Sequence, residues 1–154
     1  MKLQIGELLP GFSLADQDDQ MIAIQDFVGR PLVIFFYPKD DTPVCTIEAC
    51  TFESNYNEFK NLDAEVFGIS ADSVNSHKRF ATKHGLTFKL LSDSKNEVEK
   101  LFGVKRNLFG LLQERITFIF DEKGILIHSF QSQLNGKKHI REALLALKNA
   151  NSAK

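Results

Sequence analysis

The stretch that decides the fold is Leu32-Val-Ile-Phe-Phe36-Tyr-Pro38-Lys-Asp-Asp-Thr42-Pro-Val-Cys45-Thr-Ile-Glu48-Ala-Cys50. It opens with a continuous apolar run, which is typical of a strand buried on both faces of a sheet. Thr42 and Pro43 follow a short polar loop, and these residue types favour the first positions of a helix. The stretch therefore predicts a buried central strand that leads into a helix carrying both cysteines of the chain.

Patterns on either side of this stretch predict an α/β fold. Strands are expected at 31–37, 65–70, 86–91, 116–120 and 125–130, a hairpin at 12–15 and 21–24, and helices at 43–62, 73–84, 96–102 and 137–148. This order favours a mixed central sheet with helices on both faces and an N-terminal hairpin extension. No repeat, low-complexity tract or linker interrupts the pattern, so residues 1–154 are expected to form a single domain.

Composition narrows the class of protein further. The 154 residues have a formal net charge of −1, which gives no electrostatic basis for binding nucleic acid or an anionic membrane. No apolar stretch is long enough for a signal peptide or a membrane span, so we expect a cytoplasmic protein. Two cysteines are too few for a disulfide scaffold, and in that compartment a cysteine pair is more often catalytic or metal-binding than structural.

Cys45 falls at the third position of the helix that Thr42 and Pro43 begin. The N-terminus of a helix carries a partial positive charge and unpaired N–H groups, which stabilise an anion and favour a reactive thiolate. The alternative is that Cys45 is merely a buried apolar residue, because it shares an apolar stripe with Ala49 and Phe52. The helix cap and the thiol share one turn, which favours the reactive interpretation.

Cys50 lies further along the same predicted helix, on a different side. With about 100° and ~1.5 Å of rise per residue, its Cα lies roughly 8–9 Å from that of Cys45. A disulfide needs a Cα separation of about 4.4–6.8 Å. If the two thiols ever bond, the first turns of the helix must unwind, which suits a transient catalytic disulfide better than a permanent one.

Several segments resemble the peroxiredoxins, and one of them points to the bacterioferritin-comigratory, or Q, subfamily. The chain resembles the family's active-site signature at Phe36-Tyr-Pro38-x-x-x-Thr42-x-x-Cys45. The subfamily is indicated by Glu48-Ala-Cys50, and the later segment that carries the family's active-site arginine is resembled by Arg115-Ile-Thr-Phe118. The similarity covers nearly the whole chain.

The resemblance implies a thioredoxin-like fold and a thiol peroxidase of the atypical two-cysteine type. In this chemistry Cys45 would be the peroxidatic thiolate, which attacks a peroxide oxygen and becomes a sulfenic acid. Thr42 would hold the peroxide, Arg115 would stabilise the thiolate and the developing negative charge, and Pro38 would limit access of water. Cys50 would be the resolving thiol, which condenses with the sulfenic acid to an intramolecular disulfide.

The resemblance also implies substrates and partners. The substrates would be hydrogen peroxide and organic hydroperoxides, reduced to water and alcohols, and the reductant would be thioredoxin or glutaredoxin. No cofactor or metal is expected, nor a nucleic-acid or membrane partner, and the protein would be a monomer or a weak homodimer. One departure is Val44, where the subfamily usually has glycine, and valine would slow unwinding of the helix start.

The remaining polar residues carry weaker expectations. Glu48 either orients the arginine or faces solvent. Asp40 and Asp41 are expected to be solvated loop charges, and His77 and His84 to lie at the edges of an apolar helical stripe. No histidine is spaced with a cysteine as in common zinc sites, which argues against a zinc centre.

Two other functions compete with a peroxidase. A thioredoxin-type protein disulfide reductase usually carries Cys-x-x-Cys, whereas four residues separate the thiols here. That class also has a proline opposite its dithiol, and no proline follows Pro43. A peroxide sensor or holdase would use the same cysteines, because sensing and turnover share their first step.

Overall fold

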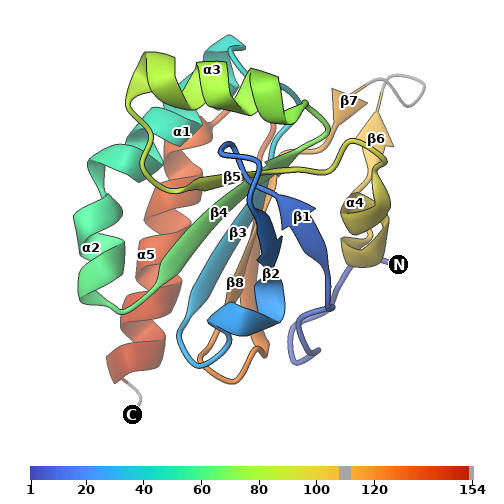
Figure 1. Cartoon of the computed structure of the whole chain (residues 1–154). Coiled ribbons are helices and arrows are strands. Elements are labelled where there is room, and N and C mark those ends of the chain that lie inside the picture. The colour runs from blue at the N-terminus through green and yellow to red at the C-terminus, as the bar shows by residue number, and fades with distance from the viewer. Residues whose placement is uncertain (108–111, 153–154) are drawn as a thin grey trace.

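Figure 1 shows the computed structural model, which describes residues 1–107 and 112–152. Its main sheet is built from β1 (Ser13–Ala15), β2 (Met21–Ala23), β3 (Leu32–Phe36), β4 (Glu65–Ser70), β5 (Lys89–Ser92), β8 (Ile116–Phe120) and β9 (Leu126–Gln131). Their order across the sheet is β2-β1-β5-β4-β3-β8-β9, with both parallel and antiparallel neighbours. The mixed sheet and its N-terminal β1–β2 hairpin are therefore as predicted.

Helices cover both faces of this sheet, as the sequence predicts. They are η1 (Ile24–Phe27, a 3₁₀ helix), α1 (Pro43–Ser54), α2 (Tyr56–Asn61), α3 (Val74–His84), α4 (Glu97–Phe102) and α5 (Gly136–Ser152). Figure 1 shows helices on both sides of the sheet. Buried side chains of α1, α2, α3 and α5 join one apolar cluster, and those of η1 and α4 join a second cluster. None of the described helices is both long and apolar enough to cross a membrane.

Strand β3 lies near the centre of the sheet, parallel to β4 and antiparallel to β8. All five of its residues are fully buried, which explains the continuous apolar run. Val33 and Phe35 enter the cluster beneath α1, whereas Ile34 and Phe36 enter the other one. Phe52 of α1 stacks on Phe35 with 4.4 Å between ring centroids, so the helix after the strand is anchored to it.

The register between β3 and β8 places the end of one strand beside the start of the other. Phe36, the last residue of β3, pairs with Ile116, the first residue of β8. Arg115 therefore emerges beside the loop that connects β3 to α1. Arg115 lies 70 positions after Cys45 in the chain, and this register brings it to the start of the helix that carries Cys45.

One predicted helix is two helices in the structure. The sequence predicts a continuous helix at 43–62, but Asn55 interrupts it with φ −107° and ψ 8°. The Asn55 side chain donates a hydrogen bond to the Thr51 carbonyl at 2.8 Å, and the Ser54 hydroxyl donates to the Cys50 carbonyl at 2.9 Å. Such side-chain bonds to the preceding turn compete with the helical ladder and bend or end the helix.

Other boundaries differ by a few residues. The strand predicted at 86–91 begins at Lys89, because Gly85 takes φ 64° and the Leu86 N–H bonds back to the Ala81 carbonyl at 2.9 Å. The closing helix α5 extends beyond the predicted 137–148 at both ends. The antiparallel pair β6 (Arg106–Asn107) and β7 (Leu112–Gln113) is too short to show a periodic pattern in the sequence.

Candidate active site

Cys45 lies in the first turn of α1 and is almost completely buried, with 1% of its surface exposed. Its side chain belongs to the apolar cluster that contains Ala49 and Phe52, so the predicted stripe is confirmed. The thiol also interacts with the guanidinium of Arg115. Cys45 is therefore buried, as one interpretation of the sequence expects, and it has a cation beside it.

Thr42 precedes α1 at the predicted N-cap position. Its backbone is extended, and its carbonyl accepts the first helical bond from the Thr46 N–H at 2.8 Å. The expected side-chain cap is absent from α1, because the Thr42 hydroxyl instead donates to the Lys39 carbonyl at 2.8 Å. This bond closes the loop before the helix, and the hydroxyl oxygen keeps its lone pairs for another donor.

Arg115 is held in place by groups from two other segments. Its Nη1 donates to Glu48 Oε1 at 2.8 Å, and its Nε donates to the Gln133 carbonyl at 3.0 Å. Burial, the largest effect, lowers the pKa of Arg115, but Glu48 and Cys45 together raise it above its ordinary value. The guanidinium is therefore a fixed cation that touches both the thiol and the buried carboxyl.

Glu48 is fully buried, so of the two expectations for this residue the contact with Arg115 is correct. Burial raises the pKa of Glu48 to about 8, although Arg115 opposes this shift. Its Oε2 has no hydrogen-bond partner and lies 3.5 Å from His139 Nδ1. Burial lowers the pKa of His139 to about 4, so this imidazole is neutral and faces a carboxyl that keeps its proton.

The tautomer of His139 explains why Glu48 Oε2 lacks a donor. His139 Nε2 lies 2.9 Å from the Ser132 carbonyl, which can only accept, so this nitrogen carries the single ring proton. His139 Nδ1 then accepts a hydrogen bond from the Thr117 hydroxyl at 2.7 Å. A bare carboxylate oxygen at the same nitrogen would face a lone pair, whereas a protonated Glu48 would not.

Cys50 lies in the same helix but in a different environment. It is half-buried, and burial together with the charge of Glu53 raises the pKa of its thiol above the ordinary value. Helix α1 is continuous across both cysteines, and both are free thiols in this structure. The separation of roughly 8–9 Å expected from helical geometry therefore applies, and Arg115 contacts Cys45 alone of the two.

A cavity of about 370 Å³ opens beside the start of α1, and most of its lining is apolar. The lining residues are Pro38, Lys39, Thr42, Pro43, Val44, Arg115, Gln133 and Leu134. Three predicted site residues thus share one cavity, Cys45 is buried beside it through its contact with Arg115, and Cys50 does not line it. Gln133 and Leu134 were missed in the sequence, because they follow β9 and carry no local motif.

The start of α5 approaches the first turns of α1 very closely. A Cβ atom on Gly136 would lie 3.0 Å from the Val44 carbonyl oxygen and 3.2 Å from Glu48 Cβ. Glycine is therefore the residue that permits this contact without displacing α1. The same close approach packs α5 against the first turns of α1, next to Glu48.

Comparison with known proteins places this site in a family. The family model described as "AhpC/TSA family" matches residues 5–129. Peroxiredoxin Q of Triticum aestivum, a chloroplastic protein, is 44% identical over 148 residues, which are 96% of this chain and 68% of that protein. Peroxiredoxin Q of Arabidopsis thaliana, also chloroplastic, is 43% identical over 149 residues, which are 97% of this chain and 69% of that protein.

Solved structures agree. The peroxidoxin BcpB from Mycobacterium tuberculosis superposes with a TM-score of 0.89 and 34% identity, over 96% of this chain and 97% of that one. The bacterioferritin comigratory protein of Xanthomonas campestris gives a TM-score of 0.83 and 33% identity, over 90% of this chain and 91% of that one. The fold is therefore thioredoxin-like, and the site is that of a thiol peroxidase.

The chain belongs to the AhpC/TSA family and, within it, to the peroxiredoxins of the Q, or bacterioferritin-comigratory, type. It is thus an oxidoreductase that reduces peroxides with a thiol, in a family whose members generally use a thioredoxin-type reductant.

The buried carboxyl predicts an unusual dependence of stability on pH. Because the pKa of Glu48 is about 8 in the folded state and ordinary in the unfolded state, the folded state holds the extra proton. The pKa of His139 is lowered from 6.5 to about 4, so this group makes stability rise with pH mainly between about pH 4 and 6.5, below the range used here. Between pH 6.5 and 8, urea titrations should show the unfolding free energy falling by on the order of 1–2 kcal/mol from Glu48.

The variant Glu48→Gln should remove this fall, because the amide does not titrate. Glu58→Gln, which changes an exposed carboxylate, is the matched control and should keep the wild-type slope. A slope in Glu48→Gln equal to that of the wild type would show that Glu48 is already ionised at pH 6.5.

Proposed function

We propose that Cys45 is the thiolate that attacks the peroxide and that Cys50 resolves the product. The observation that carries this assignment is the contact between Arg115 and Cys45, which gives one thiol a buried cation. Cys50 has no such contact, and the raised pKa of its thiol keeps it protonated at neutral pH. A protonated thiol competes poorly for peroxide but can still act on a sulfenic acid after proton loss.

The first step transfers one oxygen to sulfur. The Cys45 thiolate attacks the nearer peroxide oxygen, the O–O bond breaks, and the second oxygen leaves with the bonding electrons and takes a proton. Sulfur becomes a sulfenic acid, and the product is water or an alcohol. Arg115 stabilises the negative charge that moves from sulfur to the leaving oxygen, and the Thr42 hydroxyl oxygen can accept a hydrogen bond from the peroxide O–H.

The second step forms a disulfide. The Cys50 sulfur attacks the sulfenic sulfur of Cys45 and loses its proton, and the hydroxyl group leaves as water. The product is an intramolecular disulfide. Helix α1 must open for this, because two helical residues five apart cannot reach disulfide geometry. A thioredoxin or glutaredoxin then reduces the exposed disulfide and restores both thiols.

The lining of the cavity supports a broad range of peroxides. Pro38, Pro43, Val44 and Leu134 give it an apolar side, which would accommodate an alkyl group, while Thr42 and Arg115 give the polar end. The similar bacterioferritin comigratory protein of Xanthomonas campestris has alkyl peroxide reduction activity. We therefore propose organic hydroperoxides as substrates beside hydrogen peroxide, with Pro38 limiting access of water to the thiolate.

The remaining proposals concern the setting of the reaction. We propose that the chain works as a single domain in the cytoplasm, as a monomer or weak homodimer, without cofactor, nucleic acid or membrane. Protein disulfide reduction and peroxide sensing are the alternatives. An insulin-reduction assay beside a peroxide-consumption assay separates the first of them from a peroxidase.

Substitution of each cysteine tests the division of roles. Cys45→Ser should abolish peroxide consumption, because a serine hydroxyl is not ionised at neutral pH. Cys50→Ser should keep the first oxidation within about threefold of the wild-type rate but form no intramolecular disulfide, since only one thiol remains. Stopped-flow oxidation and intact-mass spectrometry measure both. Fast thioredoxin-linked turnover in Cys50→Ser would reject Cys50 as the resolving residue.

Removal of the buried cation should slow the first step. Arg115→Ala is expected to lower the rate of Cys45 oxidation by about 10²–10³, as in sites that lose one charged donor to a developing anion. Arg106→Ala is a matched control, because this arginine pairs with Glu99 on the α4 side of the structure. An oxidation rate equal to that of the wild type would contradict the proposed role of Arg115.

Opening of α1 should depend on the residue that departs from the subfamily. Val44→Gly should speed disulfide formation after oxidation by up to about threefold, because glycine resists helix by ~0.8–1 kcal/mol relative to alanine and valine by less. Hydrogen exchange should rise at residues 42–52 in the disulfide form, while β8 stays protected. Identical exchange in the two redox forms would contradict the unwinding and point to a disulfide between chains.

A further inference from the structure

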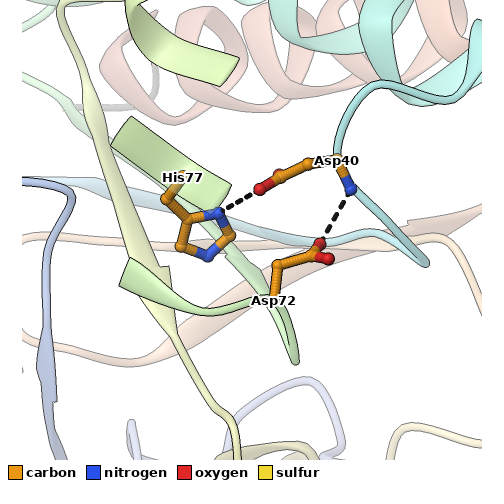
Figure 2. Close-up of side chains that lie close together, drawn as sticks. All are labelled: Asp40, Asp72 and His77. Carbon is orange, nitrogen blue, oxygen red and sulfur yellow. Dashed lines mark hydrogen bonds and ion pairs between the residues drawn. The ribbon is translucent and has the colours of Figure 1, made fainter. Parts of the chain in front are cut away.

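A second buried polar cluster lies under the loop that connects β3 to α1. Asp40, in that loop, is expected from the sequence to be a solvated charge, but the structure leaves it only 7% exposed. Its carboxylate accepts hydrogen bonds from the Tyr37 hydroxyl at 2.6 Å and from the Ser76 hydroxyl at 2.8 Å. Figure 2 shows its third partner, the imidazole of His77 from α3, and the neighbouring Asp72. The prediction for Asp40 is therefore wrong, because α3 covers this side of the loop.

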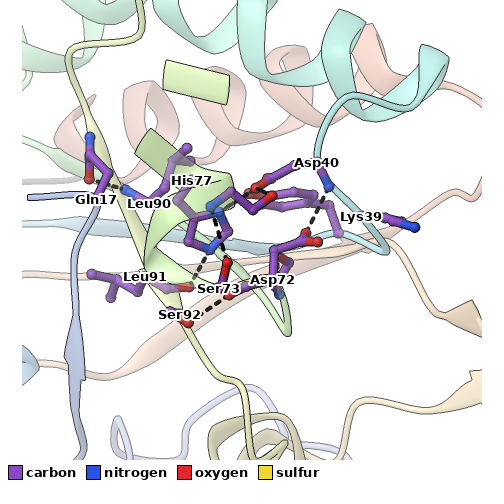
Figure 3. Close-up of polar contacts among 12 residues, drawn as sticks. Gln17, Lys39, Asp40, Asp72, Ser73, His77, Leu90, Leu91 and Ser92 are labelled. Carbon is purple, nitrogen blue, oxygen red and sulfur yellow. Dashed lines mark hydrogen bonds and ion pairs between the residues drawn. The ribbon is translucent and has the colours of Figure 1, made fainter. Parts of the chain in front are cut away.

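His77 is fully buried rather than at the edge of its helical stripe, and both of its ring nitrogens face oxygen atoms. Nδ1 lies 2.7 Å from Asp40 Oδ2, and Nε2 lies 3.1 Å from the Leu91 carbonyl of β5, as Figure 3 shows. A carbonyl can only accept, so Nε2 carries a proton. Nδ1 also lies 3.4 Å from the Tyr37 hydroxyl, so this nitrogen has two polar partners. His77 therefore ties the Asp40 carboxyl group on one side to the β5 backbone on the other.

Two further groups complete the polar cluster around this imidazole. Asp72 Oδ2 accepts from the Asp40 N–H at 2.8 Å and from the Ser70 hydroxyl at 2.7 Å, which brings a second carboxylate to the cluster. Burial, with Asp40 as a further cause, raises the pKa of Tyr37 well above its ordinary value, so its hydroxyl stays neutral and donates. A buried carboxylate is stable only where a cation or several donors compensate it, and His77 is the basic group that touches Asp40.

The same cluster has the spacing of a metal site, because possible ligand atoms of Asp40, Asp72 and His77 lie within 4.8 Å of one another. The hydrogen bonds described above already use both Asp40 oxygens and both His77 nitrogens. A metal ion would have to displace these donors and break the contact of His77 with β5. The cluster is therefore a hydrogen-bonded clasp between a loop, a helix and a strand.

The loop that this clasp holds has a strained backbone. Asp41 has φ 60°, a left-handed conformation that residues other than glycine rarely adopt. Exposed pairs of Asp41 with Lys83 and His84, both from α3, also tie it down. Without the buried clasp, these surface pairs, which contribute little to stability, would oppose the strain alone.

We propose that His77 is a positioning residue for peroxide binding: it clasps Asp40 to β5 and so holds the loop of residues 38–42 over the thiol. The loop carries Pro38 and Thr42, which line the cavity with Arg115. This inference rests on the proposed role of Thr42 in holding the peroxide. Loss of the clasp leaves Cys45 and Arg115 in place, because these depend on α1, Glu48 and Gln133.

The test compares two reactions of the same thiol. In His77→Gln and in Asp40→Asn, the rate of Cys45 oxidation by hydrogen peroxide should fall about 10–100-fold, since a misplaced positioning group can cost that much. Alkylation of Cys45 by iodoacetamide, which needs no peroxide orientation, should stay within about twofold of the wild-type rate. His128→Gln is the matched control, because it removes a partly exposed imidazole paired with Glu142.

Two outcomes would overturn the proposal. One is an equal loss of oxidation and alkylation in Asp40→Asn, and the other is an oxidation rate unchanged from that of the wild type. Failure of the proposed function is distinguishable, because peroxide would then oxidise Cys50 or leave Cys45→Ser active.

Discussion

The site depends on one buried guanidinium. Only 4% of the Arg115 side chain is exposed, so protein groups rather than water must compensate its charge. An uncompensated buried charge is strongly destabilising. The register of β3 and β8 delivers Arg115 to the start of α1, and Glu48 and Gln133 then hold it there. The proposed choice of Cys45 as the reacting thiol follows from the position of this guanidinium.

The ionisable groups near this guanidinium differ in their pKa values. Glu48 keeps its proton up to about pH 8, so at neutral pH it fixes Arg115 without cancelling its charge. The charge is then available to the Cys45 sulfur, whereas Cys50 stays a thiol in the same helix. The close contact of Gly136 with α1 supports the first turn from one side, and the clasp of His77 and Asp40 supports the preceding loop from the other. The first turn of α1 and the loop before it are thus both supported, and the proposed Cys45–Cys50 disulfide requires α1 to open.

Much of this arrangement could be predicted from the sequence, because the strand, the helix start and the thiol are adjacent in the chain. The apolar run at β3 and the Thr42-Pro43 pair gave the strand and the helix start. The break at Asn55 and the burial of Asp40 could not be predicted, because side-chain bonds to the preceding turn and cover by α3 decide them. Gln133 and Leu134 were missed because residues after β9 reach the site through tertiary contacts alone.

The central claim is that the buried cation selects Cys45, and one measurement tests it most directly. The reduced wild-type protein is mixed with less than one equivalent of hydrogen peroxide in the presence of a sulfenic-acid trap, and the labelled peptides are mapped by tandem mass spectrometry. The label is expected on Cys45, with the rest of the oxidised protein as a Cys45–Cys50 disulfide within one chain. Label on Cys50 would contradict it.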